Sequence, residues 1–199
     1  MAIYKVEKLL DKDELAHRAS QVIQKQILTT LTNKKRCQIA LSGGSTPSKV
    51  YSLLGQIDLP WHRVDVFLGD ERWVEPHDEL SNALMIRRTL LSKEYGAQAC
   101  FTPVPTLQCD TPEASAKAFS KLITAKCTGI PPVFDLVLLG LGEDGHTASL
   151  FPGTQSLKIQ DSFTTVSTGN GQERVTITAP VFNVARKIVF LVSGNSKRL

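Results

Sequence analysis

Apolar side chains recur every three or four positions in four stretches of the chain, a spacing that is typical of amphipathic helices. The longest stretch is residues 11–31, whose apolar stripe holds Leu15, Ala19, Val22, Ile23, Ile27 and Leu31. Asp11, with Glu14 three residues later, resembles a capping box and predicts that this helix begins there. Shorter helices are expected over residues 48–54, 79–91 and 113–126.

Short apolar runs alternate with these helices. They lie at residues 37–41, 64–68, 134–139, 174–178 and 187–192. Continuous apolar runs, rather than strict alternation with polar residues, are typical of parallel strands that are buried on both faces. The order predicts an α/β, Rossmann-like fold over residues 1–199, a single domain with a mostly parallel sheet and helices on both faces. Residues 152–173, rich in Gly, Ser, Thr and Gln, are expected to form a long surface loop.

Polar residues follow four of the predicted strands. They occupy residues 42–46, 69–72, 140–146 and 193–197. Ligands of such sheets bind beyond the carboxyl ends of the strands. The sequence therefore predicts that these four segments meet at one site.

The first of these segments reads Ser-Gly-Gly-Ser-Thr-Pro over residues 42–47. Its two glycines let backbone N–H groups approach an anion, Ser45 and Thr46 add hydroxyl donors, and a helix N-terminus follows. This pattern suits a phosphate, although the lysine spacing of a P-loop is absent. A capped strand–turn–helix connection explains the same residues equally well.

Gly140, Gly142 and Gly145 have the spacing of a dinucleotide-binding fingerprint. The context contradicts that interpretation, because Glu143 and Asp144 would place negative charges against a pyrophosphate. Residues 151–153, Phe-Pro-Gly, would also end the helix that the fingerprint requires. A dinucleotide site is therefore not predicted here.

The same segment places Asp144 two residues before His146. A carboxylate beside an imidazole holds one tautomer and raises the basicity of the ring, which suits a general base near neutral pH. The alternative is an aspartate that caps a helix, with an unrelated surface histidine nearby. The other histidines, His17, His62 and His77, have no partner pattern and predict no function.

Charged residues also follow the second and the last strand. Arg72 could bind a phosphate or carboxylate through two nitrogens, and Asp70 could handle a proton. Lys197 could balance the charge of a phosphate. The alternatives are a local ion pair that covers the strand end and a solvated lysine.

Composition excludes several classes of protein. A hydrophobic content of 42% excludes a disordered chain, and a net charge of +4 is weak evidence for nucleic-acid binding. The four cysteines have no C-x-x-C spacing and no histidine cluster, so neither zinc nor a redox motif is predicted and a reducing compartment is expected. No apolar stretch has the length of a signal peptide core or a membrane span, so no membrane partner is expected.

Taken in order along almost the whole chain, several motifs closely resemble the glucosamine-6-phosphate isomerase/6-phosphogluconolactonase family. They are residues 42–47, 69–72, 81–82, 140–152 and Ser193-Gly194-x-x-Lys197. The most specific is Gly-Glu-Asp-Gly-His-Thr-Ala-Ser-Leu-Phe-Pro over residues 142–152.

The resemblance implies a cytoplasmic enzyme of the oxidative pentose phosphate pathway, a monomer or homodimer. It would hydrolyse 6-phospho-D-glucono-1,5-lactone to 6-phospho-D-gluconate with a histidine-activated water and no metal or organic cofactor. Its small-molecule partner would be this sugar-phosphate lactone. By position, the resemblance gives catalytic roles to His146, Asp144, Arg72 and Asp70. It gives contacts with the substrate phosphate to Gly43, Gly44, Ser45, Thr46, Lys197 and Arg174.

Two alternatives remain for the function. The isomerase/deaminase branch is expected to carry a glutamate five residues beyond the histidine and an aromatic residue after Asp-Glu, where this chain has Phe151 and Arg72. A non-catalytic sugar-phosphate sensor domain would not need the pair of Asp144 and His146. Family members continue beyond the position of Leu199, so the resemblance also predicts that this chain lacks C-terminal elements.

Overall fold

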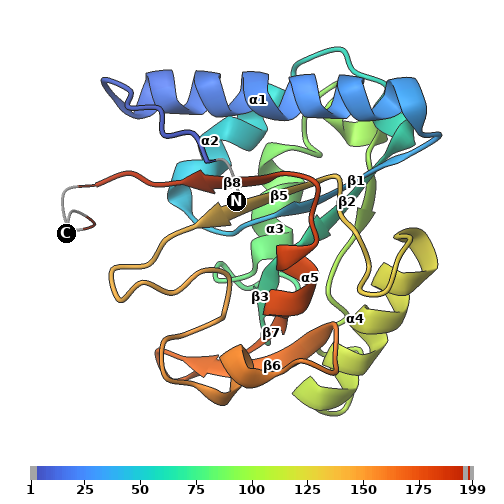
Figure 1. Ribbon diagram of the computed structural model, residues 1–199, viewed down its shortest axis with the longest axis vertical. Coiled ribbons are helices and arrows are strands. Elements are labelled where there is room, and N and C mark those ends of the chain that lie inside the picture. Colours follow the sequence, from blue (N-terminus) through green and yellow to red (C-terminus); the bar gives the residue numbers. More distant parts are fainter. Residues whose placement is uncertain (1–3, 195–196, 198–199) are drawn as a thin grey trace.

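The computed structural model of the protein describes residues 4–194 and 197 (Figure 1). Its centre is a sheet of five parallel strands in the order β4-β2-β1-β5-β8. The strands are β1 (Cys37–Leu41), β2 (Val64–Leu68), β4 (Cys100–Thr102), β5 (Leu136–Gly140) and β8 (Ile188–Leu191). All residues of β1 and β2 are buried, as continuous apolar runs predict for the middle of a covered sheet.

Helices cover both faces of this sheet. The helices are α1 (Lys12–Asn33), α2 (Ser45–Leu54), α3 (Asn82–Thr89), α4 (Pro112–Lys126) and α5 (Ala179–Asn183). In Figure 1, α1 lies above the sheet while α4 and α5 lie below it. Short 3-10 helices occupy Trp61–Arg63, Gly96–Gln98 and Gln155–Lys158. The predicted α/β fold with a mostly parallel sheet is confirmed.

The N-terminus of α1 follows the capping prediction in part. The Asp11 side chain accepts hydrogen bonds from the backbone N–H groups of Asp13 and Glu14, both at 2.8 Å. The Glu14 carboxylate reaches back to the N–H of Leu10 at 2.7 Å, one residue earlier than in a capping box. Two otherwise unpaired donors are therefore satisfied at the start of the helix.

A second sheet was not predicted, and the strand expected at 174–178 belongs to it and not to the parallel sheet. The second sheet is antiparallel, in the order β3-β7-β6, with β3 (Asp70–Arg72), β6 (Thr164–Gly169) and β7 (Gln172–Ile177). The expected loop over residues 152–173 is therefore wrong, because it contains a 3-10 helix, all of β6 and the start of β7. Polar residues such as Thr165 and Thr168 hid the strand, because they lie on opposite faces of β6 and its burial does not alternate.

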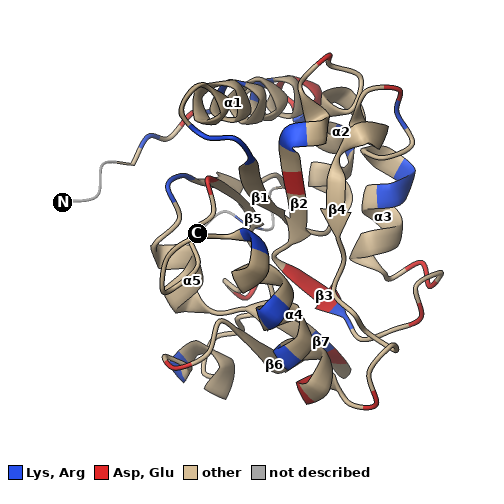
Figure 2. Cartoon of the chain, turned by 90° about the vertical axis from the view of Figure 1, so that its right-hand side faces the viewer, with Lys and Arg blue, Asp and Glu red and all other residues tan. Residues whose placement is uncertain are grey.

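The second sheet brings the residues after β2 under the parallel sheet. Asp70 and Arg72 of β3 lie opposite Thr176 and Arg174 of β7. Figure 2 shows the acidic segment of β3 between the parallel sheet and β7. Arg174 and the loop after β2 are thereby placed on one side of the molecule.

Some apolar side chains remain at the edge of the parallel sheet. Ile188, Phe190 and Val192 on and after β8 are 37%, 56% and 39% exposed. No helix within residues 4–194 combines the length and apolar content that crossing a membrane requires.

Candidate active site

The segments that follow β1, β2 and β5 meet at a cavity of about 270 Å³, and Lys197 beyond β8 lines it too. Of the predicted site residues, those that line it are Gly43, Gly44, Ser45, Thr46, Asp70, Arg72, His146, Arg174 and Lys197. Asp144 does not line the cavity itself, but it is hydrogen-bonded to His146, which does. The predicted convergence of the polar segments is thus present, while the roles of the single residues stay predictions.

The start of α2 forms one wall of the cavity. Gly44 precedes the helix with a φ of 109°, a left-handed conformation that favours glycine. No side chain caps the first N–H groups of α2, and Pro47 has none to offer. The N–H groups of Ser45 and Thr46 therefore remain available to an anion, where the helix dipole favours negative charge.

Asn82 fixes the loop before α2. Its side-chain nitrogen donates to the backbone carbonyl of Asp70 at 2.9 Å. Its side-chain oxygen would lie only 2.0 Å from a Cβ on Gly43. A side chain at position 43 would collide with this buried amide. The loop after β1 and the strand β3 are thus locked together by one residue at the start of α3.

His146 and Asp144 form a direct pair. The Nδ1 atom of His146 lies 2.5 Å from Oδ1 of Asp144, which also accepts from the His146 backbone N–H at 3.1 Å. These hydrogen bonds hold the pKa of Asp144 below its ordinary value. No helix begins at Asp144, so the alternative of a helix-capping aspartate is wrong. Because an ionised carboxylate only accepts, Nδ1 carries the proton and Nε2 is the basic nitrogen.

Gly142 makes room for this pair. A Cβ at position 142 would lie 2.1 Å from Nδ1 of His146 and 2.6 Å from Oδ1 of Asp144. The backbone of Gly142 also donates to the carbonyl of His146 at 2.8 Å. The glycine is thus explained by the close packing of the imidazole, and no dinucleotide-binding helix follows the segment.

Two arginines present donors that have no partner within the described residues. They are Nε of Arg72 and Nε of Arg174, and the hydroxyl of Ser42 on the same cavity is also unpaired. Arg72 donates to the carbonyl of Leu80. Burial, with the nearby charge of Arg72 as a further cause, lowers the pKa of Arg174. Buried donors of this kind are costly unless a ligand accepts from them.

Asp70 and Glu71 have different surroundings. Asp70 accepts from the hydroxyl of Ser149 at 2.6 Å and lies 3.9 Å from Nη1 of Arg174. Glu71 accepts from the N–H groups of Asn82 and Ala83, both at 2.7 Å, which ties β3 to the start of α3. Burial raises the pKa of Glu71 to about 7 against these hydrogen bonds. Glu71 does not line the cavity, so its contacts are structural.

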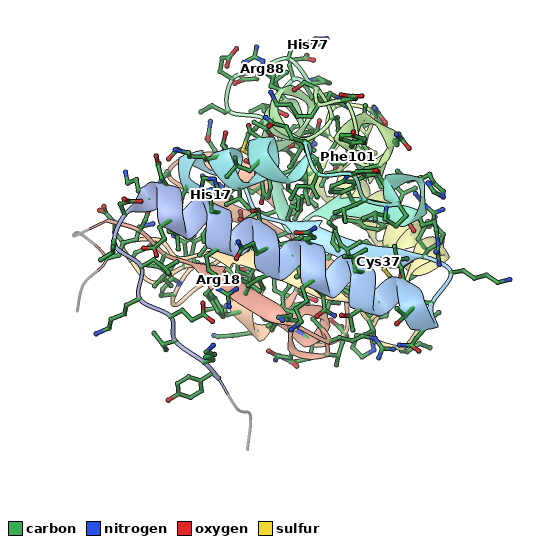
Figure 3. The ribbon with its side chains drawn as sticks, turned by 90° about the horizontal axis from the view of Figure 1, so that it is seen from above. His17, Arg18, Cys37, His77, Arg88 and Phe101 are labelled. Atoms are coloured by element: carbon green, nitrogen blue, oxygen red, sulfur yellow. The ribbon has the colours of Figure 1, made fainter. Side chains whose placement is uncertain are left out.

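Sequence reasoning assigned no role to three residues at or beside the cavity: Asn82, Ser149 and Phe151. Asn82 and Ser149 stand in motifs of the resemblance, but their partners are 12 and 79 positions away. Local spacing cannot reveal such contacts. Figure 3 shows His17 on α1 and His77 at the outer edge of the molecule, as expected for histidines without a catalytic partner.

The sequence model of the family described as glucosamine-6-phosphate isomerases/6-phosphogluconolactonase matches residues 10–199. The chain belongs to this family. Its resemblance to the family, inferred from motifs, is therefore confirmed.

Proteins with two different activities are similar to this chain. The chain is 41% identical over 196 residues to a 6-phosphogluconolactonase of Synechocystis, covering 97% of this chain and 81% of that protein. A 6-phosphogluconolactonase structure from Shewanella baltica superposes with a TM-score of 0.86 at 27% identity, covering 94% and 80% of the two chains. A monomeric glucosamine-6-phosphate deaminase has a TM-score of 0.80 at 20% identity, covering 98% and 84%. The fold alone thus does not distinguish the two activities.

Proposed function

We propose that this protein is a 6-phosphogluconolactonase, which hydrolyses 6-phospho-D-glucono-1,5-lactone to 6-phospho-D-gluconate. The observation that carries the proposal is the bonded pair of His146 and Asp144 in one cavity with the uncapped start of α2. A base and an anion-binding wall fit a substrate with an ester carbonyl and a remote phosphate. The name of the relative that is 41% identical supports the same activity.

The phosphate is proposed to bind at the start of α2. The N–H groups of Ser45 and Thr46 lie at the positive end of the α2 dipole, which faces this cavity. Lys197 lines the same cavity. The hydroxyl of Thr46 lies 2.9 Å from that of Ser193, which ties the start of α2 to the segment after β8. Binding the phosphate would orient the distant lactone ring, so the interaction serves catalysis without touching the reacting bond.

His146 is proposed to act as the general base. Nε2 takes a proton from a water whose oxygen attacks the lactone carbonyl, giving a tetrahedral oxyanion. The bond between the carbonyl carbon and the ring oxygen then breaks, and the imidazolium returns the proton to that oxygen. Asp144 holds the tautomer and balances the charge of the imidazolium.

The oxyanion needs donors that are not already occupied. Arg72 and Arg174 each have a buried Nε without a partner among the described residues. Donors that are placed before the reaction stabilise the developing charge without a cost of reorganisation. Arg72 is proposed for this role, and Arg174, which the resemblance assigned to the phosphate, is proposed to share it because it lies opposite Arg72 in the second sheet. The carboxylate of Asp70 lies 3.9 Å from Arg174.

The setting follows from the same proposal. A single catalytic domain acting in the oxidative pentose phosphate pathway of the cytoplasm would work in a reducing compartment. Cys37, Cys100, Cys109 and Cys127 are free in the structure, which supports that setting. Phe151, at the position where the deaminase branch is expected to carry a glutamate, favours the lactonase over that branch.

The test is hydrolysis of freshly generated lactone above its spontaneous rate by the wild type and by His146→Ala. We expect the variant to lose about 10²- to 10⁴-fold in kcat, the usual contribution of a general base. His77→Ala is the matched control, because His77 is an exposed histidine at the outer edge (Figure 3). Ammonia release from glucosamine 6-phosphate is followed in parallel.

Each alternative gives a different result. Ammonia release without lactone hydrolysis would indicate the deaminase. Sugar-phosphate binding without either reaction would indicate a sensor domain. An unchanged lactone rate in His146→Ala would refute the assignment of the base.

A further inference from the structure

The aromatic ring of Phe151 contacts both groups that the proposed reaction needs. Its centroid lies 4.5 Å from that of the His146 imidazole, with 36° between the ring planes. The guanidinium carbon of Arg174 lies 5.6 Å from the same centroid. Phe151 is 8% exposed, and nothing in the proposed reaction assigns it a role.

The ring itself is held from behind by the second sheet. A Cβ on Gly169, at the end of β6, would lie 2.0 Å from Cζ of Phe151 and 2.3 Å from Cε2. Gly169 does not have a left-handed φ, so its backbone conformation does not require glycine. The space taken by the Phe151 ring is what excludes a side chain there.

The backbone of Phe151 is fixed as well. Its carbonyl accepts from the N–H of Thr154 at 3.2 Å and from the Thr154 hydroxyl at 2.7 Å. That hydroxyl lies 2.8 Å from Ser156, which in turn accepts from Ser167 of β6 at 3.4 Å. Phe151 is therefore held against the hairpin of β6 and β7 in two ways. Its backbone is connected to β6 by hydrogen bonds, and the edge of its ring packs against Gly169.

The two groups in front of the ring have few other restraints. Within residues 4–194 and 197, no hydrogen bond orients the guanidinium of Arg174, and its carboxylate neighbour Asp70 is 3.9 Å away. The bond from Asp144 fixes the His146 tautomer at one ring nitrogen only. An aromatic face favours a cation above it and restrains the plane of a stacked ring.

We propose that Phe151 is a positioning residue, whose ring sets the orientations of both the His146 imidazole and the Arg174 guanidinium. This inference rests on the proposed function, because it gives meaning to the orientation of the base and of the oxyanion donor. One ring thus fixes the position of the loop after β5, which carries His146, relative to β7, which carries Arg174. Geometry errors of about 1 Å at reacting groups lower rates by as much as about 100-fold.

The test compares Phe151→Leu with Phe119→Leu, steady-state kinetics and unfolding being measured for both. Phe119 is a fully buried phenylalanine of α4 that does not line the cavity, so it reports the cost of losing an aromatic ring from the core. We expect kcat/KM to fall about 30-fold in Phe151→Leu, through both a lower kcat and a higher KM. Phe119→Leu should lose comparable stability and retain its kinetic constants.

A spectroscopic signature separates positioning from general damage. The His146 ring C–H signals, assigned by their loss in His146→Ala, should carry an upfield ring-current shift in the wild type. Phe151→Leu should abolish this shift, and Phe119→Leu should leave it unchanged. The chain has four histidines, so the assignment is tractable.

Gly169→Ala approaches the same ring from the other side while leaving Phe151 in place. It should lower kcat/KM and move the His146 signals, and the double variant Gly169→Ala/Phe151→Leu should be no worse than Phe151→Leu alone. Additive losses in the double variant would contradict action through the ring. So would a Phe151→Leu protein with unaltered kinetics.

The two proposals fail in different ways. An unchanged rate in His146→Ala would overturn the proposed base and the positioning role together. A large loss in His146→Ala beside a fully active Phe151→Leu would overturn the positioning role alone.

Discussion

The two ends of the five-stranded sheet both bury charged side chains, but only at the carboxyl end do charged side chains keep nitrogen donors without hydrogen-bond partners. At the amino end, Asp135 accepts from Lys34 at 2.7 and 2.9 Å and from the backbone of Gln38 at 2.9 Å. Beside it, Asp65 accepts from Arg36 at 2.7 and 2.9 Å. At the carboxyl end, the Nε atoms of Arg72 and Arg174 have no partner within the described residues.

The comparison of the two ends shows which charges are structural. Burial alone would raise the pKa of Asp65, but hydrogen bonds from Arg36 and Gln38 hold it below its ordinary value. At the other end, burial and the charge of Arg72 lower the pKa of Arg174. A charge that is already paired offers little to a ligand, whereas an arginine that lines a cavity and has unpaired donors gains a partner when an anion binds.

The largest loss of stability is expected from removing a buried carboxylate from the paired charges at the amino end of the sheet. Asp135→Ala leaves the ammonium of Lys34 and the guanidinium of Arg186 without their carboxylate, so the free energy of unfolding should fall by about 3–5 kcal/mol. Denaturant unfolding measures the change, with the exposed Asp161→Ala as the control. The kcat of the folded fraction should stay unchanged, and a selective loss of kcat would contradict a purely structural amino end.

Glu71 lies between the two classes, because its hydrogen bonds come from neutral backbone N–H groups and do not outweigh its burial. Its pKa of about 7 in the folded protein exceeds the ordinary 4.5, so its contribution to stability is present below pH 4.5 and is lost as pH rises through 7. The free energy of unfolding of the wild type minus that of Glu71→Gln should therefore fall by about 3 kcal/mol over this range. A flat difference would mean that the backbone donors fully offset burial.

At the uncompensated end, a loss of activity should come without a loss of stability. Arg174→Met removes a buried guanidinium with an unpaired nitrogen, so kcat/KM should fall about 100-fold, or about 2.7 kcal/mol. The free energy of unfolding should change far less than in Asp135→Ala, because the guanidinium of Arg174 makes no hydrogen bond within the described residues and Asp70, 3.9 Å away, keeps the hydrogen bond from Ser149. Steady-state kinetics and denaturant unfolding test both halves, and a drop in stability like that of Asp135→Ala would erase the distinction between the two ends.

Gly142→Ala should produce a smaller effect through geometry alone. The added methyl group would meet the imidazole of His146, so the pair with Asp144 must shift. We expect kcat to fall about 10-fold while KM changes little, since the phosphate-binding wall at α2 is untouched. Gly69→Ala is the control, because a Cβ there has only ordinary contacts at 3.8 Å and Gly69 does not line the cavity. Equal losses in both variants would show that contact with the imidazole is not what matters.

Four of the five strands of the parallel sheet were predicted, because continuous apolar runs encode β1, β2, β5 and β8 locally. The short edge strand β4, three residues long, was missed. The limits of β1 and β2 match the apolar runs at 37–41 and 64–68 residue for residue. The second sheet was missed because β6 is polar and its burial does not alternate. The Asn170-Gly171 turn that joins β6 to β7, with both residues at positive φ, is the hairpin signal in the sequence that could have found it. Wherever a role needs that sheet, as for Arg174 and Phe151, the sequence alone placed the residue weakly or not at all.

The smallest expected effect tests whether exposure, rather than charge itself, separates structural from silent ion pairs. Arg88 pairs with Glu79 at 2.5 Å, and their side chains are 57% and 75% exposed. Arg88 lies at the outer edge of the molecule (Figure 3). Since water screens such a pair, Arg88→Ala should change the free energy of unfolding by less than about 0.5 kcal/mol and leave kcat/KM unaltered. Denaturant unfolding at low and high salt measures it, and a loss approaching that of Asp135→Ala would show that burial is not what gives the amino-end network its strength.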